Sequence, residues 1–137
     1  MSFNYSKNGL LKVGDTKFKL KYIEYDTFKV KRNVQDLNSH RNTNGKLIRH
    51  ALDHACITVS FTTLDGLTNT EVEDFMSDIR SAYKDSTEKK LSVTAWCQEL
   101  NDYITQDCYL VDPEFTIKEI NDNIIIYDSI ELEFIGY

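Results

Sequence analysis

The sequence predicts one mainly β (α+β) domain over residues 1–137, an antiparallel β-sandwich or barrel with one flanking helix at about 68–84. Several long stretches alternate apolar and polar residues, which is the period of a half-buried strand. One stretch instead repeats apolar residues every three or four positions, which is the period of a helix. Eight Tyr and seven Phe against one Pro favour strands over disorder, and 137 residues suffice for one core.

Residues 16–32, TKFKLKYIEYDTFKVKR, are predicted to form one or two half-buried strands. Apolar residues alternate with lysines over most of this stretch, so one side faces the core and the other faces solvent. The polar segment after it predicts a loop over about residues 35–43. Asn44 and Gly45 then form a strong turn pair, because both residues tolerate positive φ, and a strand is expected to begin near Lys46.

The stretch RHALDHACITVSF, residues 49–61, contains residue types that bind zinc, but its second half alternates as a strand does. His50 and His54 would lie roughly 13 Å apart in an extended chain, too far apart for one metal ion unless the chain turns near Asp53. We therefore favour a strand and expect no metal or cofactor. Zinc binding by His50, His54 and Cys56 is the alternative.

Residues 68–84 are predicted to form the helix. Thr68 and Glu71 have the spacing of a capping box, and further acidic residues in the first turn suit the positive end of the helix dipole. The helix is expected to pack its apolar stripe on the sheet. That stripe comprises Val72, Phe75, Met76, Ile79 and Tyr83.

The remaining chain returns to strands in KKLSVTAW, YITQDCYLVD, EFTIKEI and IIIYDSIELEF. A short turn at Asn121, Asp122 and Asn123 separates the last two and predicts a closing hairpin. The order of strands, one helix and strands predicts a single antiparallel sheet system with a helix laid against it.

No motif for catalysis is present in the sequence. The five glycines are scattered rather than gathered in a phosphate-binding loop, and no G-x-S-x-G occurs. The many carboxylates lie on the expected polar sides of strands and helix. We therefore expect a protein that is not an enzyme.

Basic and aromatic residues interleave in FKLKYIEYDTFKVKR, as they do in sheets that bind single-stranded nucleic acid. Strict alternation, however, places Phe18 and Tyr22 opposite the lysines, so the aromatic rings are expected in the core. The net charge of −6 also opposes nucleic-acid binding. We expect no sequence-specific nucleic-acid partner.

The two halves of the chain carry opposite charge. Residues 1–68 hold eleven Lys and Arg against six Asp and Glu, a balance of +5, whereas residues 69–137 hold five against sixteen, a balance of −11. Copies of the protein are therefore predicted to attract one another head to tail. Three cysteines without C-x-x-C spacing, a polar start and no long apolar run predict synthesis in a reducing cytoplasm and no membrane partner.

Four motifs resemble those of small structural tail proteins of long-tailed bacteriophages and prophages, in the tail-tube-like or tail-tip and baseplate group. They are the loop HRNTNGKLIRHALDH, the strand and helix TVSFTTLDGLTNTEVEDFMSDI, the strand DCYLVDPEF and the closing IELEFIGY. Together they span about residues 28–137.

The resemblance implies a tail-tube-like sandwich whose copies form rings or stacks, contact other tail proteins and reside in the virion tail without catalysis. The alternative is a small non-virion module that binds nucleic acid or protein through its sheet face. Loops in assembled tubes commonly reach a neighbouring subunit, so we predict intersubunit contacts in the polar loop, with a mobile surface loop as the alternative. The predicted contact residues are Asn38, His40, Arg41, Asn42, Asn44, Gly45, Lys46 and Arg49.

Overall fold

The computed structural model describes residues 3, 8–36, 40–41, 47–48 and 51–137, with side chains described for residues 3, 8–33 and 56–137. The first half contains strands β1 (Leu11–Val13), β2 (Thr16–Lys17), β3 (Lys29–Asp36), β4 (His40–Arg41), β5 (Leu47–Ile48), β6 (Ala51–Thr62) and β7 (Leu67–Thr68), with 3-10 turns η1 (Leu20–Tyr22) and η2 (Tyr25–Thr27). Helix α2 (Asn69–Ala82) follows, and then β8 (Tyr83–Asp85), β9 (Lys90–Cys97), β10 (Asp102–Leu110), β11 (Ile117–Asn121), β12 (Ile124–Tyr127) and β13 (Glu131–Gly136).

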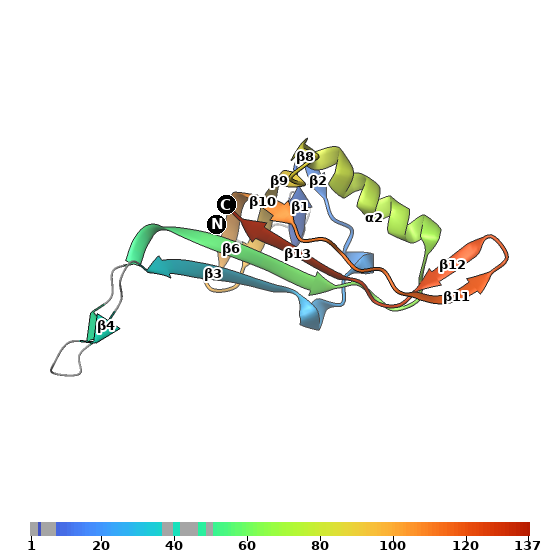
Figure 1. Cartoon of the computed structure of the whole chain (residues 1–137), viewed down its shortest axis with the longest axis horizontal. Helices are drawn as coiled ribbons and strands as arrows, with labels where there is room; N and C mark the ends of the chain where they lie inside the picture. The colour runs from blue at the N-terminus through green and yellow to red at the C-terminus, as the bar shows by residue number, and fades with distance from the viewer. Residues whose placement is uncertain (1–2, 4–7, 37–39, 42–46, 49–50) are drawn as a thin grey trace.

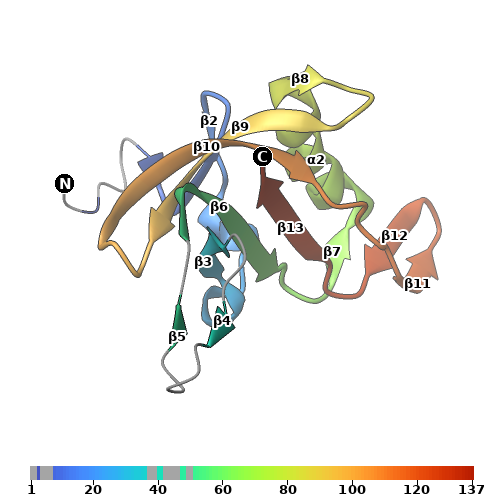
Figure 2. The same cartoon turned by 60° about the vertical axis from the view of Figure 1, so that its left-hand side comes forward.

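The described strands pair antiparallel in three sheets. The main sheet has eight strands in the order β2-β1-β9-β10-β13-β6-β3, with β8 added beside β9. A second sheet has the order β11-β12-β7, and β4 pairs with β5 in a third. The main sheet runs from β2 to β3 and does not close on itself. Among the described strands the fold is therefore consistent with the predicted sandwich and not with a closed barrel. Figures 1 and 2 show the curved main sheet with α2 against it. The predicted mainly β fold with one flanking helix is confirmed.

The core lies between α2 and the inner face of the main sheet. The helix buries Val72, Phe75, Met76 and Ile79, as its apolar stripe predicts. The ring of Phe75 lies 5.7 Å from that of Phe18, between ring centroids. Each fully buried side chain of this kind contributes roughly 1.5–3 kcal/mol relative to an exposed one. The helix is therefore held mainly by its packing on the sheet.

Helix α2 begins with the predicted capping box. Thr68 Oγ1 accepts a hydrogen bond from the Glu71 backbone N–H, and Glu71 Oε1 accepts one from the Thr68 N–H at 3.2 Å. The helix ends at Ala82 rather than near residue 84, because Tyr83 has extended dihedral angles and begins β8. Tyr83 therefore lies just beyond the helix and is half-buried.

The predicted strands over residues 16–32 are wrong in their middle. Only Thr16–Lys17 and the stretch from Lys29 on are strand, and η1 and η2 occupy the residues between. Phe18 and Tyr22 are buried, as alternation predicts, but Ile23 is buried as well and breaks the period of two. The chain must turn here because it passes from β2 to β3, which lie at opposite edges of the main sheet.

The predicted loop over residues 35–43 begins later than expected. Strand β3 continues to Asp36, and His40–Arg41 form β4. Asn44, Gly45 and Lys46 lie outside the described residues, but the antiparallel pairing of β4 with β5 brackets them, and β5 begins one residue after Lys46.

The C-terminal stretch IIIYDSIELEF is two strands rather than one. Strand β12 pairs with β11 around Asp122, whose φ of 55° fits the predicted turn. Strand β13 then leaves this hairpin and enters the main sheet between β10 and β6. The chain therefore does not end in a hairpin.

Candidate assembly surfaces

The first surface is the ribbon of β3 and β6 with the short β4–β5 hairpin beyond it. Strands β3 and β6 pair from Lys29 opposite Ser60 to Asp36 opposite Ala51. Figure 1 shows the β4–β5 hairpin projecting away from the main sheet, at the opposite end of the molecule from β11 and β12. Residues 37–50 contain three basic residues, two Arg and one Lys, and no acidic residue. We call residues 37–50 the basic arm.

The predicted contact residues all belong to this basic arm. His40 and Arg41 lie in β4, where His40 pairs with Ile48 and Arg41 with Leu47. The other six lie outside the described residues, so their intersubunit contacts stay a prediction. These six are Asn38, Asn42, Asn44, Gly45, Lys46 and Arg49.

The candidate metal ligands lie on or beside β6. The backbone is extended from Ala51 to Thr62, so the turn at Asp53 that a shared metal ion required is not formed. His54 and Cys56 both lie within this strand, and His50 is outside the described residues. In the part of the chain that the structure describes, no three His, Cys, Asp or Glu residues gather in a metal-binding group.

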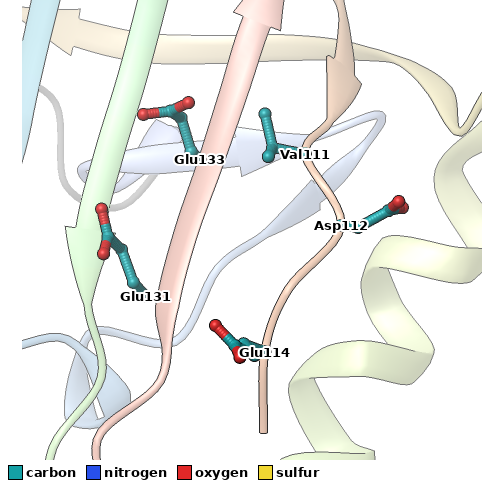
Figure 3. A pocket seen from close by; sticks show the side chains of 5 residues that line it. All are labelled: Val111, Asp112, Glu114, Glu131 and Glu133. Atoms are coloured by element: carbon teal, nitrogen blue, oxygen red, sulfur yellow. The ribbon is translucent and has the colours of Figure 1, made fainter.

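The second surface is a pocket of about 210 Å³ lined by Val111, Asp112, Glu114, Glu131 and Glu133. In Figure 3, Glu131 and Glu133 project from β13 toward β6, and Glu114 points toward β13 from the segment beside it. Asp112 points away from these three and pairs with Lys89, Nζ to Oδ1, at 2.5 Å. We call this group the acidic pocket. It concentrates negative charge on the outward side of the sheet.

The third surface is the hairpin of β11 and β12, here called the isoleucine hairpin. All five residues of β11 are exposed, and the exposed fractions of Ile117, Ile120 and Ile124 are 51%, 65% and 48%. Its base is nevertheless fixed, because β12 pairs with β7 and Lys118 Nζ lies 2.8 Å from Asp65 Oδ2. Three apolar side chains are thus presented to solvent on an anchored element.

The fourth surface is an aromatic cluster where β9 turns into β10, here called the aromatic end. The ring centroid of Trp96 lies 5.1 Å from that of Tyr103 and 5.3 Å from that of Phe3. Tyr103 Oη donates a hydrogen bond to the Gly9 carbonyl at 2.7 Å, which fixes the ring. Leu100, in the turn, has an exposed fraction of 46%.

A polar contact ties α2 to η1 on the surface beside the core. Lys19 Nζ and Tyr22 Oη donate to Asp74 at 2.6 and 2.7 Å. The hydrogen bond from Lys19, together with that from Tyr22, lowers the pKa of Asp74 below its ordinary value. Asp74 therefore stays charged and holds the helix against the segment that links β2 to β3.

A protein-family model matches residues 4–137. The chain belongs to the family of unknown function DUF6711. No curated protein shows significant sequence similarity to this DUF6711 chain.

A solved structure shares the fold. It is a chain from the tail of an empty GTA particle, computed with helical refinement and C6 symmetry. The TM-score is 0.52 at 12% sequence identity, and the match covers 99% of the DUF6711 chain and 95% of the other chain. At this identity the similarity establishes the fold alone, and that fold is one found in a phage-like tail. No described helix of the DUF6711 chain is long and apolar enough to cross a membrane.

Sequence reasoning missed the isoleucine hairpin and the aromatic end. The sequence predicts a strand over Ile124, Ile125 and Ile126 but says nothing of its exposure, and Ile124 is exposed. A signal was present, because this run lacks the polar alternation that the buried strands show.

Proposed function

We propose that this protein is a structural subunit of a phage-like tail, most specifically of the tail tube, and that it acts by self-assembly and by contacts with other tail proteins rather than by catalysis. The observation that carries the proposal is the shared fold over nearly the whole length of both chains with a helically refined tail chain. In this proposal the protein is made in the host cytoplasm and resides in the virion tail.

The charge distribution supports assembly from identical copies. The basic arm and the acidic pocket belong to the oppositely charged halves of the sequence and lie at different places in the fold. In a stack or ring, the arm of one copy would approach an acidic surface of another, which favours correct orientation and fast encounter. The proposed assembly is therefore sensitive to salt.

The first test measures the mass of the purified protein by size exclusion with light scattering, over a range of protein and salt concentrations. Rings or tubes seen by electron microscopy, and a mass that falls as salt rises, are expected. Particles released by the strain that carries the gene should contain the chain at many copies per tail. A chain that is monomeric in every buffer and absent from particles would contradict the proposal and favour the binding module.

Deletion of residues 38–43 tests the role of the basic arm. The deletion should abolish the oligomer, while circular dichroism and the thermal midpoint stay those of a folded domain. An oligomer of unchanged mass would show that residues 38–43 of the basic arm make no essential contact.

A further inference from the structure

The backbone of the isoleucine hairpin is anchored to the rest of the domain, whereas several of its side chains are exposed. Asn69 Oδ1 accepts a hydrogen bond from the Ile125 N–H at 3.3 Å, in addition to the β7 pairing that anchors β12. Yet Ile120, with an exposed fraction of 65%, is as exposed as any large hydrophobic residue described. A rigid element that presents several apolar side chains is typical of a protein interface, because little conformational entropy is lost on binding.

The aromatic end provides an apolar surface on the opposite side of the molecule. Figure 2 shows the β9–β10 turn at one end and β11 and β12 at the other. Phe3, whose ring contacts that of Trp96, is 46% exposed, and Leu100 in the β9–β10 turn is exposed to the same extent. Trp and Tyr dominate the centres of protein interfaces, since they bury a large area with few rotatable bonds.

The charges of the two surfaces are complementary on the β1–β2 side of the aromatic end. Beside the aromatic end, Lys12 on β1 lies opposite Lys17 on β2. The Lys17 side chain lies alongside Gly9, whose carbonyl accepts the Tyr103 hydrogen bond. The isoleucine hairpin carries exposed Glu119 and Asp122. A hairpin docked at the aromatic end would bring these acids toward the two lysines.

The β9–β10 turn itself carries Glu99 and Asp102. Like charges would keep the acids of the hairpin away from the turn. The electrostatics therefore also set an orientation, with Glu119 and Asp122 on the β1–β2 side.

We propose that the isoleucine hairpin of one copy packs on the aromatic end of the next copy, an inference that rests on the proposed self-assembly. Each copy binds one neighbour through its isoleucine hairpin and the other neighbour through its aromatic end. The contact is therefore heterologous and repeats around a ring or along a helix. A rotationally symmetric assembly, such as the C6 particle with the same fold, is built from contacts of this kind.

The test uses two substitutions and a matched control. Ile120→Asp places a charge on the hairpin, and Leu100→Asp places one at the aromatic end. Tyr25→Asp is the control, because Tyr25 on η2 has the same 65% exposed fraction as Ile120. Each changes an exposed side chain, so all three variants are expected to fold, which circular dichroism checks.

Light scattering should give monomers for Ile120→Asp and for Leu100→Asp, and an unchanged assembly for the control. An equimolar mixture of the two monomers should give a dimer and nothing larger, because one intact hairpin and one intact aromatic end remain. Trp96 is the only tryptophan in the chain, so it reports on the aromatic end. When the second variant also carries Trp96→Phe, mixing should shift the emission of Trp96 in the Ile120→Asp protein.

If the wild-type chain and Ile120→Asp assemble equally well, the proposed interface is wrong, whereas the proposed function is not contradicted. A mixture that stays monomeric also overturns it, because an intact hairpin and an intact aromatic end would then be present without binding each other. If the wild-type chain is monomeric in solution, the test instead measures how much of each variant is incorporated into particles. Loss of incorporation for Ile120→Asp but not for Tyr25→Asp supports the interface, and equal incorporation overturns it. Absence of the wild-type chain from particles as well would reject the proposed function itself.

Discussion

Gly136→Ala is predicted to destabilise the domain through a side chain on another strand. A Cβ at position 136 would lie 1.9 Å from Gln106 Oε1 and 3.0 Å from the Ile57 backbone nitrogen. Gln106 must therefore move, and its Oε1 would no longer accept the hydrogen bond from the Ile57 N–H, now 2.9 Å long. A donor left without its partner in the interior costs about 1–3 kcal/mol of unfolding free energy. The thermal midpoint of a domain this size should fall by roughly 3–5 °C for each kcal/mol.

Urea unfolding followed by circular dichroism, at a concentration where the chain is monomeric, measures this loss. Gln106→Ala removes the hydrogen bond and the side-chain atoms that the new Cβ would contact, and it leaves the distance of 3.0 Å to the Ile57 backbone nitrogen. In that background Gly136→Ala should cost at least about 1 kcal/mol less than in the wild type, because the hydrogen bond is already absent, so the two effects are non-additive. Additive effects, or a single substitution without measurable cost, would refute the argument that Gly136 is needed to make room for Gln106.

Three further predictions concern the helix, its surface contact and the cysteines. Thr68→Ala should lower the unfolding free energy by about 0.5–2 kcal/mol through loss of the helix cap, measured by urea unfolding. The pKa of Asp74 is lowered from 3.8, so its contact with Lys19 contributes stability above pH 3.8 that is lost as pH falls through the folded-state value. The stability difference between wild type and Asp74→Asn should accordingly vanish in acid. Cys97 and Cys108 are fully buried, and burial raises the pKa of Cys108 to about 12, so mass spectrometry should find both alkylated only after unfolding.

The elements that the sequence predicts well are those whose pattern depends on one local surface. Strand β9 buries Leu91, Val93 and Ala95 and turns the residues between them outward, because its inner face packs on the core along its whole length. Helix α2 follows its stripe and its cap for the same reason. In both elements a single partner surface imposes a single period, and the period can be counted.

The elements that the sequence predicts poorly are those placed by distant parts of the chain. Residues 20–22 and 25–27 form 3-10 turns because this segment connects opposite edges of the main sheet, and the local sign in the sequence is that Tyr22 and Ile23 are both apolar. Strand β13 inserts between β10 and β6, which come from different halves of the chain. Alternation gives each strand its inner face but not its neighbours.

Only some of the candidate surfaces could be predicted from the sequence. The charge asymmetry predicts association of identical copies, and the polar composition predicts the loop within the basic arm, whereas the contacts of that loop were predicted from the resemblance to tail proteins. The isoleucine hairpin was not, because an apolar residue in a strand is usually buried, and only the structure shows that nothing covers Ile117 and Ile120 within the described chain.

The separation of core and surface also determines how folding and assembly can be distinguished experimentally. Ile120 and Leu100 are exposed and lie outside the buried cluster between α2 and the sheet, so their replacement should change monomer stability by no more than about 0.5 kcal/mol. Gly136 and Thr68 act in the opposite way, because they support the folded chain and contribute no apolar surface to the proposed interface. A substitution that abolishes the oligomer at unchanged unfolding free energy therefore identifies a contact between copies. One that lowers both reports on the domain itself.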